Sequence, residues 1–540
     1  MAFSASASPA GTPGWPEFLA FLQHAAQAKS RDDAQASARF LDSAAAIFPL
    51  DDASIGQHML DLLIARRCDD AIALAAALET LEPERAFASF RLGYALQTSD
   101  RHDESIAPFR RAMALDPSVP SLRARLAAAL GICRIDPAEQ VDLLRQALAD
   151  DPLDIDALTN LTGACRFAMD LDGALDAGER AVSLAPDNPL ALNNYALALK
   201  EAQRWDDAER VAQHALDVSP ADPAMHMNRA VLHLVRGDYA RGWSEHEARW
   251  QGSSELGGKR PAFAAPSWHG ESLAGKTLLL WGEQGIGDVL QFCRFVPALA
   301  DIVHRQGGKL VWTSFPQMGA LLTRCFGGCI DGYSTASSIK TAPPCDYQIP
   351  LMSVPMVLGV RVDTLAAQPR YLQADSDAVA AWRTRLHDET RLKVGLTWTG
   401  SRDHQRNPFR RVGWERYADA FRGIGNVAFY SLQPGERAGL PIVDFTGEFH
   451  SLDDTAAFVE SLDLVITVCT SVAHLSGALG CRTWVLLDTN PHWTWLLDRA
   501  DSPWYPSATL YRQARFADWT RVLADVARDL RVLADAKHAG

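Results

Sequence analysis

A recurring proline constrains the first half of this 540-residue chain more than any other feature of its sequence. Successive prolines are separated by 34, 34, 35, 34 and 34 residues, and they are Pro49, Pro83, Pro117, Pro152, Pro186 and Pro220. Five positions before each proline stands a small or apolar residue: Ala44, Leu78, Ala112, Ala147, Ala181 and Ala215. In the clearest repeats a second small residue stands twelve positions before the proline: Ala71, Ser105, Ala174 and Ala208. Small side chains let two antiparallel helices approach closely, and proline ends a helix. The pattern therefore predicts one helix pair per repeat.

This pattern resembles the tetratricopeptide repeat, most plainly in RLGYAL at 91–96 and RWDDAERVAQHALDVSP at 204–220. Six repeats are in register, and a seventh, degenerate one extends to Trp250. Stacked repeats of this type form a superhelix whose concave face binds extended peptides or partner helices. The resemblance implies a repeat array over residues 1–250 that recruits a protein partner or acceptor. An array that only stabilises or dimerises the rest of the chain is the alternative.

Charge and cysteine usage exclude some classes of function. Residues 1–250 hold 23 Lys and Arg against 37 Asp and Glu, whereas the remaining residues hold 29 of each. This balance offers no basic stripe to a nucleic-acid backbone. Nine scattered cysteines suit a reducing compartment. The start, MAFSASASPAGTPGW, lacks the basic and apolar regions of a secretory signal, and no apolar stretch is long enough to span a membrane. We expect a cytoplasmic protein.

The second half has a different periodicity. Residues 251–275 are rich in Gly, Pro and Ser and predict a connector. Short apolar runs that predict buried strands then follow, at 276–281, 309–313, 393–398, 427–432, 463–468 and 483–487. Because helical patterns lie between them, we expect two doubly wound α/β units, at 276–380 and 381–540. The amphipathic helix at the end of the chain could pack on either unit.

The turn after the first predicted strand reads GEQGIGD and contains Gly285, Gly287 and Asp288. A dinucleotide fingerprint would need a glycine where Leu290 stands and an acidic residue about 20 positions later, and both are missing. A P-loop is excluded because no Gly-Lys-Ser/Thr ends the turn. Asp288 is of interest because ligands bind beyond the carboxyl ends of parallel strands. Glycines that serve only the turn, and an aspartate that serves only as a helix cap, are the structural alternatives.

Two further segments follow predicted strands in the second unit. Thr470 and Ser471 lie at a predicted helix N-terminus, where a diphosphate can bind without a metal. His474 lies one turn deeper on the same face, although a histidine there is also typical of a helical core. The segment WTGSRDHQRNPFRR, at 398–411, supplies a Gly-Ser turn and several arginines at the same sheet edge.

Several motifs in this order resemble the heptosyltransferases of glycosyltransferase family nine, over residues 276–515: WGEQGIGDVLQFCRFVPAL, VGLTWTG, SLQPGE and ITVCTSVAHLSGALG. The order of repeats followed by a transferase is also similar to that of the O-linked N-acetylglucosamine transferases. The resemblance implies an α-helical tetratricopeptide-repeat solenoid followed by an α/β GT-B domain of two Rossmann-like units.

The resemblance also implies roles for residues. Asp288 matches the catalytic base, and the donor-binding positions are Gly285, Gly287, Gly400, Ser401, Arg410, Gln433, Thr470, Ser471 and His474. The family motif Asp-Thr-x-x-x-His keeps its threonine and histidine here, but Cys469 replaces its aspartate. Asn407-Pro408 replaces the Asp-Arg that precedes the matching arginine in relatives.

These observations predict an inverting, metal-independent glycosyltransferase that moves a sugar from a nucleotide-diphosphate sugar to an acceptor hydroxyl, with no cofactor. The sequence Asp170-Leu171-Asp172 lies in a repeat turn rather than beyond a strand, so it does not indicate a metal site. An interaction scaffold whose transferase domain has lost catalysis is the main alternative, and a nucleotide-sugar hydrolase or epimerase has no dedicated residue in its favour. The sugar, the nucleotide and the acceptor stay open.

Overall fold

The computed structural model describes residues 14–253, 255–283, 285–335, 342–365, 370–435, 439 and 441–539. The prediction about a secretory signal concerns mainly residues 1–13, which lie outside this range. The chain divides into two compact units, Met1–Ala198 and Leu199–Gly540. In the described part of the chain, every helix is too short or too polar to cross a membrane.

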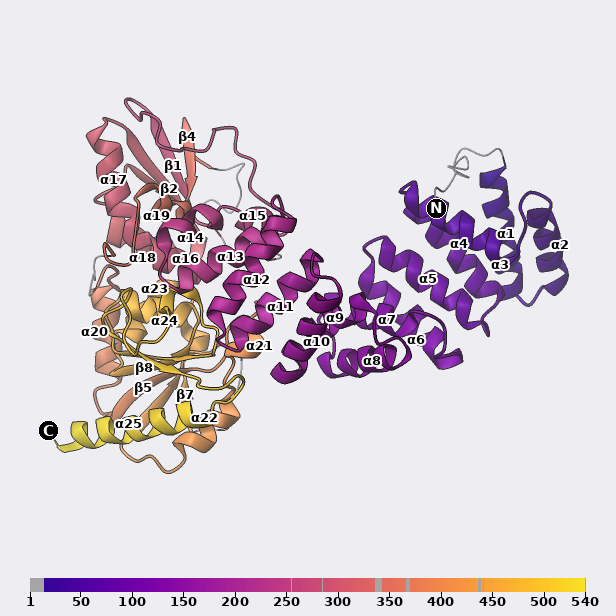
Figure 1. Cartoon of the computed structure of the whole chain (residues 1–540). Coiled ribbons are helices and arrows are strands. Elements are labelled where there is room, and N and C mark those ends of the chain that lie inside the picture. Colours follow the sequence, from indigo (N-terminus) through magenta and orange to yellow (C-terminus); the bar gives the residue numbers. More distant parts are fainter. Residues whose placement is uncertain are drawn as a thin grey trace. The chain divides into compact units, whose positions relative to one another are not determined.

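The regular elements described between residues 14 and 253 are all helices (Figure 1). They are α1 (Trp15–Ser30), α2 (Ala34–Ala45), α3 (Asp52–Ile64), α4 (Cys68–Leu81), α5 (Ala86–Thr98), α6 (His102–Leu115), α7 (Leu122–Ile132), α8 (Pro137–Asp150), α9 (Ile155–Phe167), α10 (Leu171–Leu184), α11 (Pro189–Glu201), α12 (Trp205–Val218), α13 (Pro223–Val235), α14 (Tyr239–His246) and α15 (Arg249–Gly252). Helices α2, α4, α6, α8, α10 and α12 each end two to four residues before a periodic proline. The predicted helix pairs are confirmed.

A left-handed residue recurs between the two helices of each pair. The backbone angle φ is positive at Asp32, Arg66, Asp100, Arg134, Met169, Gln203 and Gly237. Residues other than glycine rarely adopt this conformation, so its return at intervals of 34 or 35 residues marks a conserved turn geometry along the array. The sequence does not reveal this turn, because six of the seven positions carry ordinary side chains of varied chemistry.

The periodic small residues lie where the helices of a pair touch. Ala71, Ser105, Ala174 and Ala208 are each 0% exposed, whereas Leu78 and Ala147 are only half-buried. The helices approach closely at Gly93 of α5, where an added Cβ would lie 2.6 Å from the ring of Phe109 on α6. The repeat array is therefore held by close helix packing, as its sequence pattern predicts.

Two parallel sheets follow the helices. The strands are β1 (Thr277–Trp281), β2 (Lys309–Thr313), β3 (Gly332–Ser334), β4 (Tyr347–Pro350), β5 (Leu392–Thr397), β6 (Val427–Ser431), β7 (Ile442–Asp444), β8 (Leu464–Val468), β9 (Thr483–Leu487) and β10 (Ala508–Arg512). The first sheet has the order β3-β2-β1-β4, and the second has the order β10-β9-β8-β5-β6-β7. All six predicted strands are confirmed to within one residue at each end, and an α/β region with parallel sheets is confirmed with them. Strands β3, β4, β7 and β10 have no counterpart among the predicted strands.

Helices connect the strands and cover the sheets. They are α16 (Ile286–Phe292), η2 (Cys293–Phe295), α17 (Val296–Arg305), η3 (Pro316–Met318), α18 (Gly319–Phe326), η5 (Leu351–Ser353), α19 (Val354–Val357), α20 (Ser376–Arg385), α21 (Asn407–Arg410), α22 (Trp414–Phe421), η6 (Thr446–Glu448), α23 (Leu452–Val459), α24 (Ser471–Ala478), η7 (Trp493–Trp495) and α25 (Thr520–Ala539). Helix α25 packs against β5, β10 and α22, which places it on the second sheet (Figure 1).

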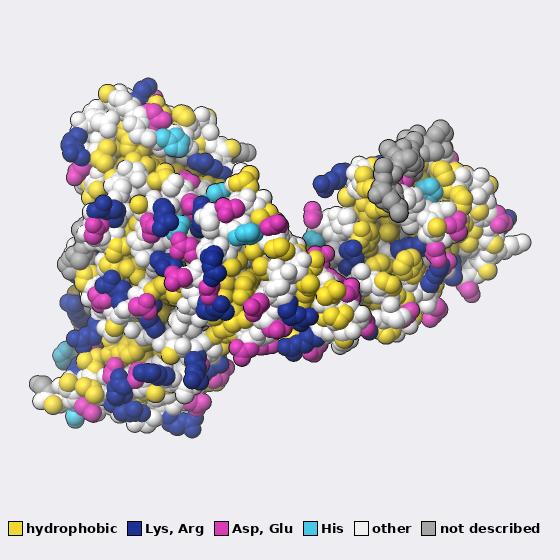
Figure 2. Space-filling model, viewed as in Figure 1, with side chains coloured by type: hydrophobic (Ala, Val, Ile, Leu, Met, Phe, Trp, Pro, Cys, Tyr) yellow, Lys and Arg dark blue, Asp and Glu magenta, His cyan; other side chains and the backbone are white. Residues whose placement is uncertain are grey.

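The last helices of the array share a core with the α/β region. Tyr239 and Trp243 of α14 belong to the same buried cluster as Phe292, Trp493 and Trp504. The predicted connector contributes to this core, since Trp268 and Leu273 are buried in the cluster as well. On the face shown in Figure 2, acidic and basic side chains are interspersed over the molecular surface.

Candidate functional site

The candidate residues lie at the switch points of the two sheets, where the chain leaves a central strand toward opposite edges. In the first sheet this point lies between β1 and β4, and residues 282–288 follow β1 there. In the second sheet it lies between β5 and β8, and the segments 398–411 and 469–471 follow these two strands. Ligands of open α/β sheets bind at such points. The topology therefore gives these loops the position of a ligand site.

Asp288 lies in the first turn of α16 and is half-buried. Its Oδ2 accepts a hydrogen bond of 3.0 Å from the backbone N–H of Gly285, the residue that caps the helix. The cap predicted as a structural alternative is thus present. Burial is the main cause that raises the pKa of Asp288 to about 6; the nearby charge of Glu283 acts in the same direction, whereas the Gly285 N–H and the Arg410 charge act in the opposite direction. Asp288 is consequently ionised at neutral pH and basic enough to accept a proton.

The two sheets bring their site loops together through α16 and α24. A Cβ on Gly287 would lie 3.3 Å from His474 Cδ2 and 3.5 Å from Ser471 Cα. Glycine at this position therefore allows the N-terminal turn of α16 to approach the N-terminal turn of α24. Asp288 and the predicted diphosphate-binding turn, which lie far apart in the sequence, are neighbours in the structure.

Helix α24 begins as the sequence predicts. Thr470 is its N-cap, and its Oγ1 accepts a hydrogen bond of 3.2 Å from the backbone N–H of Val472. The same oxygen lies 3.2 Å from Oγ1 of the buried Thr467. Thr470 and Ser471 are half-buried, so the first turn of the helix is within reach of a ligand.

His474 is held as a neutral ring. Its Nδ1 lies 2.9 Å from the hydroxyl oxygen of Tyr505, and its ring stacks on Trp495 with the centroids 5.6 Å apart. Burial lowers the pKa of His474 to about 3, and the charge of Arg410 acts in the same direction. This histidine can offer a bound ligand a hydrogen bond or a packing surface, but not a positive charge.

Cys469 replaces the expected aspartate with a buried thiol. Its Sγ accepts a hydrogen bond of 3.1 Å from Trp495 Nε1, and burial raises its pKa, so it stays protonated at neutral pH. Its carbonyl oxygen accepts a hydrogen bond of 2.8 Å from Arg410 Nη1. Residue 469 therefore offers the site a carbonyl oxygen and a packed thiol, and no carboxylate.

Arg410 lies against the Gly-Ser turn. A Cβ on Gly400 would lie 2.8 Å from Arg410 Cζ, so a larger residue would displace the guanidinium from this position. Within the described part of the chain, Arg410 Nε is buried without a hydrogen-bond partner. Asn407 accepts a hydrogen bond of 2.9 Å from the backbone N–H of Gly400 through Oδ1, a contact that an aspartate could also make. The Asn407 departure therefore preserves the turn.

Two candidate residues make only local polar contacts. Ser401 is exposed, and its Oγ accepts a long hydrogen bond of 3.4 Å from the backbone N–H of Asp403. Gln433 exchanges hydrogen bonds of 3.1 and 3.2 Å with Ser431 at the end of β6. The amide oxygen of Gln433 is buried and has no partner among the described residues. Their roles in donor binding stay predictions.

Three cavities border the segment that follows β9, and each shares lining residues with the next. One of about 40 Å³ touches Arg410, Cys469 and His492, and it shares Asp488 and Pro491 with a second of about 310 Å³. A third, of about 760 Å³, continues from the second along the start of α12. The first is smaller than the roughly 300–1,000 Å³ typical of small-molecule sites. A ligand of that usual size is therefore too large for the first cavity alone.

Two buried ion-pair groups at the site were not predicted from the sequence. Arg249 holds Glu283, which lies in the same loop as Asp288, and Arg406 joins Glu201 to Asp488. A glutamate directly after an apolar strand, in WGE, is the only sequence signal for the first group. Among the residues that the structure describes, no three His, Cys, Asp or Glu side chains cluster in a way that suits a metal ion. The absence of a metal from the reaction stays a prediction.

A family profile for the tetratricopeptide repeat matches residues 59–120 and 195–255. Solved structures similar to part of this chain include MamA from Desulfovibrio magneticus RS-1. It is 19% identical, the match covers 31% of this chain and 92% of that chain, and the TM-score is 0.27. YrrB, a tetratricopeptide-repeat protein described as having an unusual peptide-binding site, has 18% identity, 35% and 94% coverage and a TM-score of 0.30. The profile identifies the repeats in this chain, and repeats of this kind mediate contacts between proteins.

A curated relative covers more of the chain. Protein FlbA of Caulobacter vibrioides (strain ATCC 19089 / CIP 103742 / CB 15) is 27% identical over 432 aligned residues, which cover 73% of this chain and 70% of that protein. This share is larger than the repeat array, so the similarity includes part of the α/β region.

Proposed function

We propose that this chain is a glycosyltransferase that moves a sugar from a nucleotide-diphosphate sugar to an acceptor hydroxyl, with inversion and without a metal. One observation carries the proposal: the approach of the Asp288 loop to the N-terminal turn of α24, each at the switch point of its own parallel sheet. Two parallel α/β units with facing loops also agree with the GT-B fold that the sequence motifs imply.

In this mechanism Asp288 takes the proton from the acceptor hydroxyl while that oxygen attacks the anomeric carbon of the donor. The bond from this carbon to the diphosphate breaks, and the nucleoside diphosphate leaves. The N-terminus of α24, with Thr470 and Ser471, stabilises the charge that develops on the diphosphate. Arg410 supplies a positive charge beside it, and its unpartnered Nε is a donor available to a phosphate oxygen. The repeats recruit the protein that carries, or presents, the acceptor.

A non-catalytic interaction scaffold is the second candidate, and Cys469 favours it. The buried thiol is engaged by Trp495 and offers no carboxylate where the resemblance predicts one. The cavity beside Arg410 and Cys469 has a volume of only about 40 Å³, which also favours a non-catalytic scaffold.

A thermal-shift panel with nucleoside diphosphates and nucleotide sugars separates the two candidates. A ligand at 100 times its dissociation constant stabilises a protein by about 2.7 kcal/mol, which a melting curve detects. We expect a selective rise in melting temperature that is lost in Arg410→Gln. Arg411→Gln is the matched control, since Arg411 is the exposed neighbour of Arg410, and it should retain the shift. A flat panel with the wild-type protein would contradict a donor site and favour the scaffold.

A further inference from the structure

The last helices of the repeat array touch both loops of the candidate site. Glu201 ends α11, and Arg249 begins α15, so both precede the α/β region in the sequence. Glu255 in the connector accepts a hydrogen bond of 3.1 Å from the backbone N–H of Gln405, in the loop after β5. All of these residues belong to the compact unit that begins at Leu199.

Arg249 fixes the loop that carries Asp288. The Arg249 side chain is 0% exposed, and its Nε and Nη2 each donate a hydrogen bond of 2.9 Å to the Glu283 carboxylate, whose side chain is 1% exposed. Glu283 also accepts a hydrogen bond of 2.9 Å from the backbone N–H of Met352, after β4. The remaining Arg249 donors reach Ser353, Glu247 and the carbonyl of His246. One side chain thus joins the repeat array to both loops at the switch point of the first sheet.

Arg406 fixes the loop that carries Arg410. It caps α21, four residues before Arg410, and its Nη1 donates a hydrogen bond of 2.7 Å to Glu201. Its Nη2 donates another of 3.0 Å to Asp488, which follows β9. Glu201 and Asp488 are 1% and 6% exposed. The position of this loop therefore depends on a carboxylate from the repeat array.

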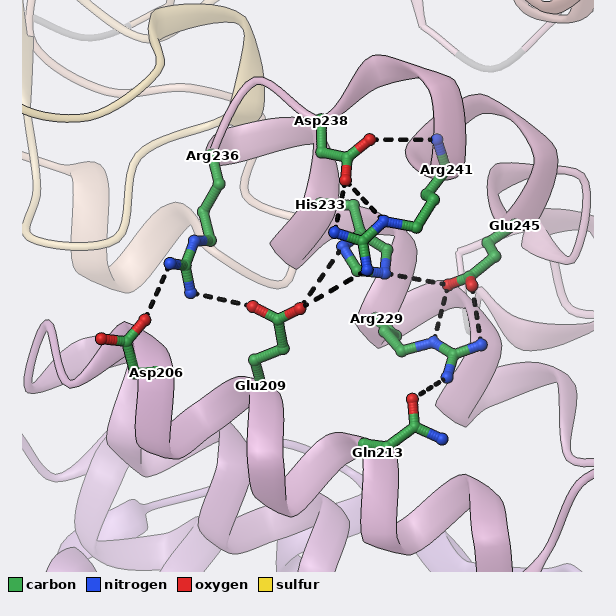
Figure 3. Close-up of polar contacts among 9 residues, drawn as sticks. All are labelled: Asp206, Glu209, Gln213, Arg229, His233, Arg236, Asp238, Arg241 and Glu245. Carbon is green, nitrogen blue, oxygen red and sulfur yellow. Dashed lines mark hydrogen bonds and ion pairs between the residues drawn. The ribbon is translucent and has the colours of Figure 1, made fainter.

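The supporting helices are braced against one another and against both sheets. Figure 3 shows the polar network on α12, α13 and α14, whose members are Asp206, Glu209, Gln213, Arg229, His233, Arg236, Asp238, Arg241 and Glu245. From α14, Trp243 donates a hydrogen bond of 2.9 Å to the carbonyl of Val360 in the first α/β part, and Tyr239 accepts one of 2.7 Å from Trp504 in the second. The last repeat is thus a fixed platform shared by the two parts.

We propose that Arg249 and Glu201 are positioning residues through which the end of the repeat array sets the geometry of the two site loops. Buried ion pairs contribute little net stability compared with apolar packing, but they fix geometry, because a displaced partner would leave a charge buried alone. A displacement of about 1 Å at a catalytic group can cost on the order of 100-fold in rate. The inference rests on the proposed function for its catalytic consequence, but the positioning itself is a property of the fold.

Arg249→Lys in the full chain tests this inference, because it keeps the charge and removes the planar fork that holds Glu283. Arg241→Lys is the matched control, since Arg241 forms an ion pair with Asp238 in the same helices but is 63% exposed. Hydrogen exchange over residues 285–292 should rise about tenfold or more in Arg249→Lys alone, and remain unchanged over residues 471–478. Turnover should fall on the order of 10- to 100-fold, while the KM for the donor stays within about twofold.

A second variant covers the case in which Arg249→Lys does not fold. Glu283→Gln removes the carboxylate that the Arg249 fork holds, so it should raise exchange over residues 285–292 as Arg249→Lys does, and lower kcat while the KM for the donor stays within about twofold. Unchanged exchange at residues 285–292, or an increase spread equally over all helices, would overturn the inference. If the wild-type protein consumes no nucleotide sugar, the proposed function fails, whereas the exchange experiment still decides the positioning role.

Discussion

The ionisation of Asp288 gives the most quantitative prediction for the proposed reaction. A general base must be unprotonated to act, so the rate follows the fraction of Asp288 that is ionised. The fold raises the pKa of this carboxyl from 3.8 to about 6, chiefly by burying it. The raised pKa means that activity is lost as the pH falls through about 6, rather than through about 4 as for an exposed aspartate.

The size of the effect follows from these two values. With a pKa of about 6, Asp288 is roughly 90% ionised at pH 7 and roughly 10% ionised at pH 5, so kcat/KM should fall about ninefold to tenfold between them. With an ordinary pKa, the same interval would change the rate by only about 6%. His474 does not titrate in this window, since burial holds its pKa at about 3.

The assay is the initial rate of nucleoside diphosphate release between pH 4.5 and 8, at donor concentrations below KM. Asp288→Asn should retain its melting temperature within a few degrees and lose on the order of 10²–10⁴ in rate. An acid limb near pH 4, or an Asp288→Asn variant with more than about a tenth of wild-type activity, would refute the assignment of Asp288 as the base.

Four further predictions follow from the same structure. A large excess of chelator should leave donor consumption unchanged, and a strict metal requirement would contradict the mechanism. Gly400→Ala should weaken donor binding measured by calorimetry by about tenfold or more, because the new Cβ would displace the Arg410 guanidinium; unaltered affinity would remove Arg410 from the donor site. Burial keeps the pKa of His474 well below its ordinary value, so the unfolded chain takes up a proton below pH 6.5 that the folded chain does not. Melting temperature should therefore fall between pH 6.5 and 4.5, and His474→Gln should reduce this fall. Gly93→Ala should lower the free energy of unfolding in urea by about 1–3 kcal/mol through the clash with Phe109, and a more stable variant would show that the helices separate easily.

The repeat array was the part most accessible from the sequence. Each repeat is a local unit, and its small residues and proline act within one helix pair. Ala174 therefore predicts the close contact within its pair, and Pro186 predicts where the second helix ends. The left-handed turns were not predictable in this way, because their conformation is imposed by the two helices rather than by residues such as Met169 and Gln203. The short strands β3 and β7, of three residues each, carry too few side chains for a periodicity.

The candidate site could be predicted from the sequence where a single residue directly follows a single strand. Asp288 and Thr470 follow apolar runs, so their place at a sheet edge could be predicted separately. Their proximity depends on how two sheets pack, which no local pattern contains. The same holds for Glu201 and Arg249, which are ordinary charged residues in a helical repeat until the fold buries them against the loops of the α/β region.

The central claim, that this chain consumes a nucleotide sugar through Asp288, is tested most directly by following the donor. The purified 540-residue chain is incubated with a panel of nucleotide-diphosphate sugars in excess chelator, and released nucleoside diphosphate is measured by liquid chromatography with mass detection. The account predicts release from a selected donor by the wild-type protein and by Arg411→Gln, and a loss of on the order of 10²–10⁴ in Asp288→Asn. Intact donors throughout the panel, or equal release by Asp288→Asn, would contradict it.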